Sequence, residues 1–189
     1  VTTCFDGFAH TGSATAGDGE SVVWYTTQTG STMTTAPSGT AVGIYTAWAA
    51  AKITATGCES ATRTLVTVTI YANPTAGITP DPATMHYGGS ISLNGHPAGG
   101  SGIYTTHAWT GDGAPYLDDD DSQTPTFSSA PAGTYNLTYT VTDNHTCTGS
   151  DNITVTVYGP DIYVDDNSNT GDTYTPAATG DDNNPGTSA

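Results

Sequence analysis

Residues 133–158 read GTYNLTYTVTDNHTCTGSDNITVTVY and contain two stretches in which apolar side chains alternate with hydroxyl and amide side chains. The apolar positions are Tyr135, Leu137, Tyr139 and Val141 in the first stretch and Ile153, Val155 and Val157 in the second. A period of two with one apolar and one polar face predicts strands of an antiparallel sheet that has its core on one side and solvent on the other. A turn that contains Cys147 joins the two stretches.

The first half of the chain has the same alternation, with Val66, Val68 and Ile70 on one face. Shorter segments between Gly, Pro, Asn and Asp residues predict further strands over 22–25, 44–48, 91–93 and 104–109. The composition agrees, since the chain has 39 Thr, 23 Gly, 11 Pro and 11 Tyr but two Glu, and Thr, Val, Ile and Tyr favour strands over helices. We therefore expect an all-β protein.

An internal repeat indicates where the chain divides. The sequence GCES at 57–60, a strand at 66–71 and Pro74 close the first copy, and TCTGS at 146–150, a strand at 153–158 and Pro160 close the second. Proline cannot donate to a continuing ladder of hydrogen bonds. We expect two small antiparallel immunoglobulin-like β-sandwiches in tandem, residues 1–73 and 74–160, followed by an extended acidic C-terminal tail, 161–189.

The charge of the chain excludes several classes of partner. Lys52 and Arg63 are its two basic residues, against 18 Asp and Glu, which gives a net charge of -16 at pH 7. Binding to nucleic acid or to anionic lipid requires clusters of Lys and Arg, so we expect neither. No apolar run approaches 18 residues, so we expect no membrane insertion. Few charges and many hydroxyl groups are typical of an extracellular or cell-surface protein.

Three cysteines, Cys4, Cys58 and Cys147, fit an oxidising compartment, and none is spaced as a CxxC metal or redox pair. We expect a Cys4–Cys58 disulfide inside the first domain, where closing the loop contributes about 4 kcal/mol in the chain-entropy model. Cys147 is then left as a buried thiol, as a consequence of the chain being a fragment, or as an intermolecular bridge.

Three stretches carry a resemblance to known families. VWYTTQTG at 23–30, with GC at 57–58 and RTLVTVT at 63–69, resembles the immunoglobulin-like modules of large secreted Bacteroidota surface proteins of the adhesin type. GTYNLTYTVTD at 133–143, followed by Cys147, resembles the last strands of a polycystic-kidney-disease (PKD) type module, although WTGDG at 109–113 lacks the Phe of the usual signature. The tail is similar to segments that open parallel β-helix domains. The resemblance implies spacer, adhesion and accessory domains.

No catalytic constellation is present in the sequence. It contains no GxSxG, HExxH or GxxxxGK motif, and its five His, at 10, 86, 96, 107 and 145, lack metal-ligand spacing. The many Asp lie in turns and runs, where solvated carboxyl groups do not make a glycosidase pair. We expect no enzyme activity.

Calcium is the candidate cofactor, and the charge pattern favours the simpler interpretation of solvated acidic loops. One candidate loop, 165–172, places oxygen side chains at alternate positions before a Gly, as flexible Ca²⁺ loops do, with Asp165, Asn167, Asn169 and Asp172 as ligands. A second candidate is the acidic run 118–121, with Asp118 and Asp120 as ligands. The alternative is that both are solvated loops that keep the protein soluble.

Two further kinds of site concern glycans. Asn136, Asn144 and Asn152 begin N-x-T sequons, and the first and last should point to solvent. The alternatives are O-linked sugars on the Thr-rich surface, and Thr residues that are present only because they favour strands. Trp24 and Trp109 lie in strand contexts and are expected in the core, and Trp48 is the residue that a sugar platform would use.

These features predict a non-enzymatic structural or adhesive module of a bacterial surface protein or secreted filament. Its expected partners are copies of itself, head to tail, or neighbouring domains of a longer chain. The apolar triplet Ile162, Tyr163 and Val164 in the polar tail is the expected contact, because an extended segment can complete the exposed sheet edge of a neighbour. The alternatives are a tail that leads into a further β-helix domain, and an accessory carbohydrate-binding module of a larger secreted hydrolase.

Overall fold

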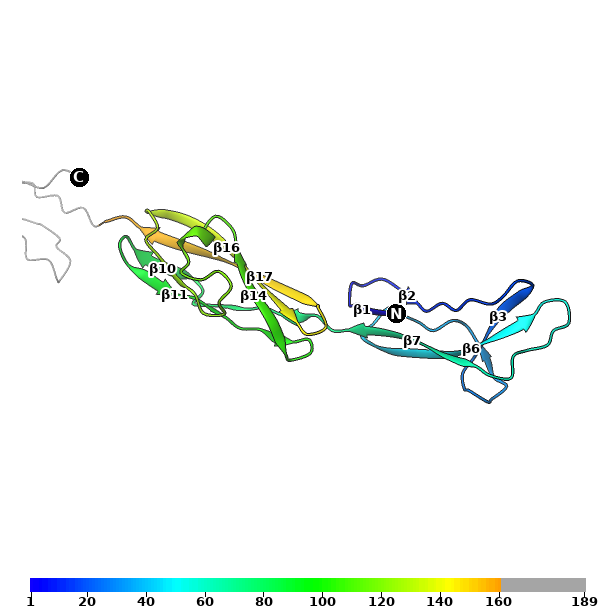
Figure 1. Cartoon of the computed structure of the whole chain (residues 1–189). Helices are drawn as coiled ribbons and strands as arrows, with labels where there is room; N and C mark the ends of the chain where they lie inside the picture. Colours follow the sequence, from blue (N-terminus) through cyan, green and yellow to red (C-terminus); the bar gives the residue numbers. More distant parts are fainter. Residues whose placement is uncertain (161–189) are drawn as a thin grey trace, which may run out of the picture.

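The structure is a computed structural model and describes residues 1–160. These residues form an all-β fold whose only helix is the short 3₁₀ turn η1 (Ala114–Tyr116), within the described part of the chain. Every strand pairing joins elements within 2–71 or elements within 74–158. The chain therefore forms two sandwiches in tandem, which we call module one (residues 1–73) and module two (residues 74–160) (Figure 1).

Module one is built on one five-stranded sheet in the order β1-β7-β6-β3-β4. Its strands are β1 (Thr2–Cys4), β7 (Thr64–Tyr71), β6 (Gly43–Ile53), β3 (Glu20–Tyr25) and β4 (Met33–Thr34). Facing it is a second layer of two short strands, β2 (His10–Thr11) and β5 (Ser38–Gly39). The second layer covers only part of the first, so module one has a thin core.

Module two has a longer main sheet in the order β10-β17-β16-β14. Its strands are β10 (Ala83–His86), β17 (Thr148–Tyr158), β16 (Gly133–Asp143) and β14 (Tyr104–Thr110). Three antiparallel pairs complete the module: β11 (Ser90–Ser92) with β15 (Thr126–Ser128), β9 (Ile78–Thr79) with β12 (Asn94–Gly95), and β8 (Pro74–Thr75) with β13 (Ala98–Gly99).

The two main sheets share one topology. In both, the last strand lies between its hairpin partner and an early strand that runs parallel to it, β1 beside β7 and β10 beside β17. The other pairings in the two main sheets are antiparallel, as the sequence predicts; the two parallel pairs were not predicted. On its other side, the hairpin partner pairs with one more long strand: β6 pairs with β3, and β16 pairs with β14. β3 and β14 occupy the position of strand C in an immunoglobulin domain.

A shared tyrosine supports the immunoglobulin-like assignment. Tyr45 follows Gly43 at the start of β6, and its hydroxyl donates to the carbonyl of Ala41 at 3.0 Å. Tyr135 follows Gly133 at the start of β16 and donates to the carbonyl of Pro131 at 2.9 Å. A tyrosine that bonds back to the preceding turn at this strand is the tyrosine corner of immunoglobulin-like sandwiches.

The predicted alternation is confirmed in the hydrophobic core of module two. Leu137, Tyr139 and Val141 are buried, as are Ile153, Val155 and Val157 on the adjacent strand. Trp109 is also buried, as expected, and its indole N–H donates to the carbonyl of Ser122 at 2.8 Å. Burial raises the pKa of Tyr139 to about 12, and its hydroxyl lies 2.6 Å from Nδ1 of His107. The core is therefore apolar, and the polar atoms of Trp109 and Tyr139 within it are paired.

The core of module one is smaller, and it is made of small side chains and close backbone approaches. Its buried apolar side chains include Ala47, Ala49, Val68 and Ile70. Gly39 of the second layer packs directly on the ring of Tyr45, where a Cβ atom would clash. No helix of the described residues is long and apolar enough to cross a membrane.

Candidate functional site: the junction between the modules

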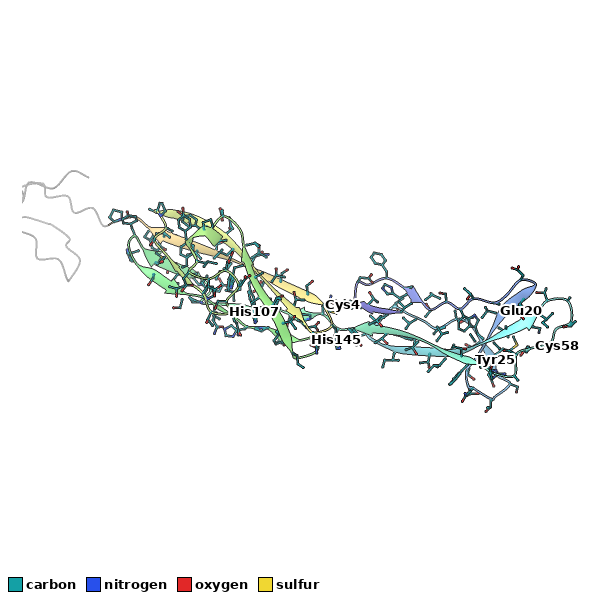
Figure 2. All side chains as sticks on the ribbon, in the orientation of Figure 1. Cys4, Glu20, Tyr25, Cys58, His107 and His145 are labelled. Carbon is teal, nitrogen blue, oxygen red and sulfur yellow. A yellow bond between two sulfur atoms is a disulfide. The ribbon has the colours of Figure 1, made fainter. Side chains whose placement is uncertain are left out.

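A disulfide joins the two modules, and it is not the one that the sequence predicts. Cys4 on β1 pairs with Cys147 in the β16–β17 turn, with their Cα atoms 5.4 Å apart. Cys58, the expected partner of Cys4, is an exposed free thiol. Figure 2 shows Cys4 at the meeting point of the modules and Cys58 at the far end of module one.

The strand order explains why the predicted Cys4–Cys58 bridge is wrong. Cys4 is in register with Tyr71, the last residue of β7, whereas Cys58 lies in the loop that precedes β7. A strand rises about 3.3 Å per residue, so the length of β7 keeps the two residues more than about 20 Å apart. A disulfide requires Cα atoms within about 7 Å.

Noncovalent contacts surround the bridge. The ring of His145, in the same turn as Cys147, stacks on the ring of Tyr71 with centroids 3.7 Å apart and planes inclined by 2°. Within module one, the side-chain amide of Asn73 donates to the carbonyl of Phe5, the residue after Cys4, at 2.9 Å. The turn of module two therefore rests on the last strand of module one.

A buried carboxylate holds the β16–β17 turn in shape. The Asp143 side chain is fully buried and accepts hydrogen bonds from the backbone N–H groups of Ser101, His145 and Cys147, each at 2.9 Å. Burial opposes ionisation of this carboxyl, but the three donors outweigh burial and hold the pKa of Asp143 below its ordinary value. The turn that carries Cys147 and His145 is therefore pre-organised for the junction.

The linker between the modules is itself part of module two. Pro74 and Thr75 form β8, which pairs with β13. Gly149 at the start of β17 lies so close to the carbonyl of Pro74 that a Cβ atom would clash with it. Three features therefore restrain the angle between the modules. The linker is paired in β8, Asp143 caps the β16–β17 turn, and the disulfide bonds this turn to β1.

A second polar cluster lies at the opposite end of module one. The Tyr25 hydroxyl donates to the Glu59 carboxylate, and this bond raises the pKa of Tyr25 and lowers that of Glu59. Cζ of Arg63 lies 3.3 Å from the centre of the Tyr25 ring, and Nζ of Lys52 lies 3.5 Å from Glu59. Both basic residues of the chain are thus held at this pole, beside the loop of Cys58.

The acidic run 118–121 is folded onto its own backbone. Asp118 accepts from the N–H of Thr126 at 2.7 Å, which lowers the pKa of Asp118, and Asp119 accepts from the N–H of Asp121 at 3.1 Å. Across residues 1–160, no three His, Cys, Asp or Glu side chains are grouped to hold a metal ion. Calcium at Asp118 and Asp120 stays a prediction. The other candidate ligands, Asp165, Asn167, Asn169 and Asp172, lie outside the described residues, as do Ile162, Tyr163 and Val164.

The three predicted glycosylation sites lie on the surface. Asn136, Asn144 and Asn152 are exposed. Two of the sequons face each other across β16 and β17, where Thr138 donates to Asn152 at 2.7 Å and Thr154 donates to Asn136 at 3.2 Å. Their exposure makes the sites accessible, and glycan attachment stays a prediction. Trp24 and Trp48 in module one are half-buried.

Comparison with known proteins finds a family match that lies within module two. Residues 83–157 match the K319L-like PKD domain family. Fibronectin(III)-like modules of CbhA from Clostridium thermocellum are 16% identical, with 84% of this chain and 89% of that chain covered and a TM-score of 0.43. The PKD domain of KIAA 1837 protein is 19% identical, with 53% and 92% covered and a TM-score of 0.39. No curated protein matches the chain.

Sequence reasoning did not single out the residues that make the junction. Asp143, His145 and Tyr71 each lie beside a recognised feature, but nothing in their spacing indicates that they meet. The repeat of the two cysteine-containing turns carried a usable signal. If the modules are equivalent and arranged in tandem, the β16–β17 turn lies at the linker end of module two, beside β1, whereas the β6–β7 loop lies at the far end of module one.

The disulfide assignment can be tested with trypsin. Cleavage after Lys52 and Arg63 leaves one cysteine in each of the three peptides, 1–52, 53–63 and 64–189. Without reduction we expect 1–52 linked to 64–189 and 53–63 released with a free thiol, because Cys4 and Cys147 are in contact. Mass spectrometry of the unreduced digest decides the pairing, and 1–52 linked to 53–63 would contradict the structure.

The role of Asp143 can be tested through pH. Because the folded-state pKa is below the unfolded value, the stabilisation is present above the unfolded pKa of about 4 and is lost as pH falls through the folded pKa. We expect Asp143→Asn to lower the free energy of unfolding at pH 7 by about 2 kcal/mol. Denaturant titrations at pH 7 and pH 3 should show that this difference shrinks at the lower pH.

A matched control is Asp121→Asn, because Asp121 is exposed. This variant should keep the stability of the unaltered protein at both pH values. If Asp143→Asn behaved as the control does, the carboxylate would not hold the turn.

Proposed function

We propose that the chain is a non-enzymatic extracellular spacer, a rod-like building block of a bacterial surface protein or secreted filament. The observation that carries the proposal is the restrained junction, in which one disulfide, one ring stack and a capped turn tie two sandwiches into an elongated unit (Figure 1). Motion between the domains of one chain is the default expectation, so a junction tied in this way suits a spacer, which holds its two ends at a fixed separation.

An extracellular location is supported by the bridge itself. Disulfides persist in secreted and cell-surface proteins and are rare where thiols are kept reduced. The match of residues 83–157 to a PKD family supports the same location, because such modules are common outside cells. Origin in a Bacteroidota adhesin rests on the sequence resemblance.

Assembly through the tail is the second part of the proposal. Residues 161–189 contain six Asp and no Lys or Arg, and their one apolar triplet is Ile162, Tyr163 and Val164. Pairing of this triplet with a neighbouring copy buries an apolar segment and covers a sheet edge that is otherwise open to aggregation. Repeated head-to-tail docking that does not close on itself gives a filament.

An accessory carbohydrate-binding module is the alternative, and one observation favours it. Trp48 lies on the outer face of the module-one sheet, on a strand that also carries Ile44, which is 71% exposed. Selective binding on a glycan array that is lost in Trp48→Ala would favour this alternative over a pure spacer.

Deletion of residues 161–189 tests the assembly. In the full chain we expect the average mass from static light scattering to rise with concentration, because the tail of each copy docks on the next. The deletion variant should stay monomeric at the same concentrations. A full chain that is monomeric at high concentration, with and without Ca²⁺, would contradict assembly through the tail, as would unchanged association of the deletion variant.

A further inference from the structure

Module one contains an open groove between its two layers. The groove has a volume of about 430 Å³ and lies toward the pole of the β6–β7 hairpin. Its floor is the core-facing side of the main sheet, and one wall is the segment that follows β2. The lining residues that the argument uses are Ala14, Thr15, Val22, Ala49, Ala51 and Val66.

The groove exists because the second layer is short. β2 and β5 cover the sheet near Tyr45 and Val68, and β2 ends at Thr11. Beyond that point the sheet presents the small side chains of Ala49 and Ala51, which leave space above them. In module two the large side chains of Leu93 and Phe127 are fully buried in the core.

The wall of the groove has free backbone groups. Residues 13–16 belong to no strand, and within residues 1–160 no backbone hydrogen bond joins them to another segment. Their N–H and C=O groups can therefore pair with an added strand. No residue that lines the groove carries a charge. Its lining combines the Ala and Val side chains with the hydroxyl side chains of Ser13, Thr15, Ser60, Thr62 and Thr64, so an uncharged extended segment that turns its apolar side chains to the floor fits it.

The segment that meets these requirements is the triplet Ile162, Tyr163 and Val164. Side chains two residues apart on a strand point the same way, so Ile162 and Val164 can face the alanine floor together while Tyr163 points out. The triplet is uncharged, although the rest of the tail is acidic.

The triplet cannot reach the groove of its own chain. β7 leads from the groove to the junction and β17 leads from the junction to the far end of module two, as Figure 1 shows. At about 3.3 Å per residue the two strands together span about 55 Å. Ile162 lies four residues after Tyr158, which is a reach of at most about 14 Å. The occupant therefore comes from a second copy.

We infer that Ile162–Val164 of one copy docks as an added strand in the groove of module one of the next copy, beside residues 13–16. The inference rests on the head-to-tail assembly proposed above and names its acceptor site. In this arrangement, the tail of the neighbouring copy extends the short second layer of module one at the groove. The added strand then completes the thin core of module one.

Four variants of the full chain test the inference by sedimentation. Ala51→Phe fills the groove, and its control Thr46→Phe places the same side chain on the opposite face of β6. In the tail, Ile162→Asp with Val164→Asp removes the apolar contacts, and its control is Thr173→Asp with Thr175→Asp, which adds the same charge outside the triplet. We expect Ala51→Phe and the double Asp variant to be monomeric, and both controls to associate as the unaltered chain does.

The possible outcomes separate the groove from the assembly itself. If Ala51→Phe associates normally while the double Asp variant is monomeric, the tail docks elsewhere, which overturns the groove and leaves the assembly standing. If the unaltered chain is monomeric, both are overturned.

A peptide titration covers the case in which Ala51→Phe does not fold. A synthetic peptide of residues 159–166 is added to the double Asp variant, and methyl resonances are followed by NMR. The resonances of Ala49, Ala51 and Val66 should shift, and those of Ile44 and Leu65 should not. No shift at saturating peptide, or shifts confined to other methyl groups, would overturn the groove as the acceptor.

Discussion

The Cys4–Cys147 disulfide closes a loop across 143 residues that includes most of both modules. In the chain-entropy model a loop of this length stabilises the folded state by about 5 kcal/mol. The loop begins on the first strand of module one and ends in a turn of module two, so the bridge acts on their orientation as well as on stability. The stack of His145 on Tyr71 and the capping by Asp143 place the turn where the bridge can form.

The two modules depend on this junction unequally. Module two has a full core around Trp109, Tyr139 and Phe127, and its second layer is extensive. Module one shares the same main-sheet topology and the same tyrosine corner, but its second layer is a pair of two-residue strands. A small domain with a thin core gains most from a covalent tie, from an added strand, or from both. The bridge at one pole of module one and the open groove toward the other fit a unit that becomes complete within an array.

The strands and the core follow from the sequence because they depend on local pattern. The alternation around Leu137 and Val155 determines which face of the sheet is buried. Trp109 is expected in the core because a sandwich usually buries a Trp of its central strands, and it is buried. The pairing of Cys4 does not follow, because it depends on which ends of two strands meet. The expected Cys4–Cys58 bridge stays within one module, whereas the parallel pairing of β1 and β7 carries Cys4 to the opposite end of the sheet from Cys58. Which strand ends meet cannot be predicted from the periodicity of the sequence or from the spacing of its cysteines.

The most direct test of the account measures the distance between the modules. The native thiol of Cys58 takes one spin label, and Ala132→Cys, at an exposed site in the turn before β16, takes the second. Pulsed electron paramagnetic resonance on the oxidised protein should give a single narrow distribution of the distance between the two spin labels. This distribution should broaden when Cys4 and Cys147 are both changed to Ser. A distribution as broad in the oxidised protein as in the double Ser variant would show that the modules move independently and would contradict the restrained junction.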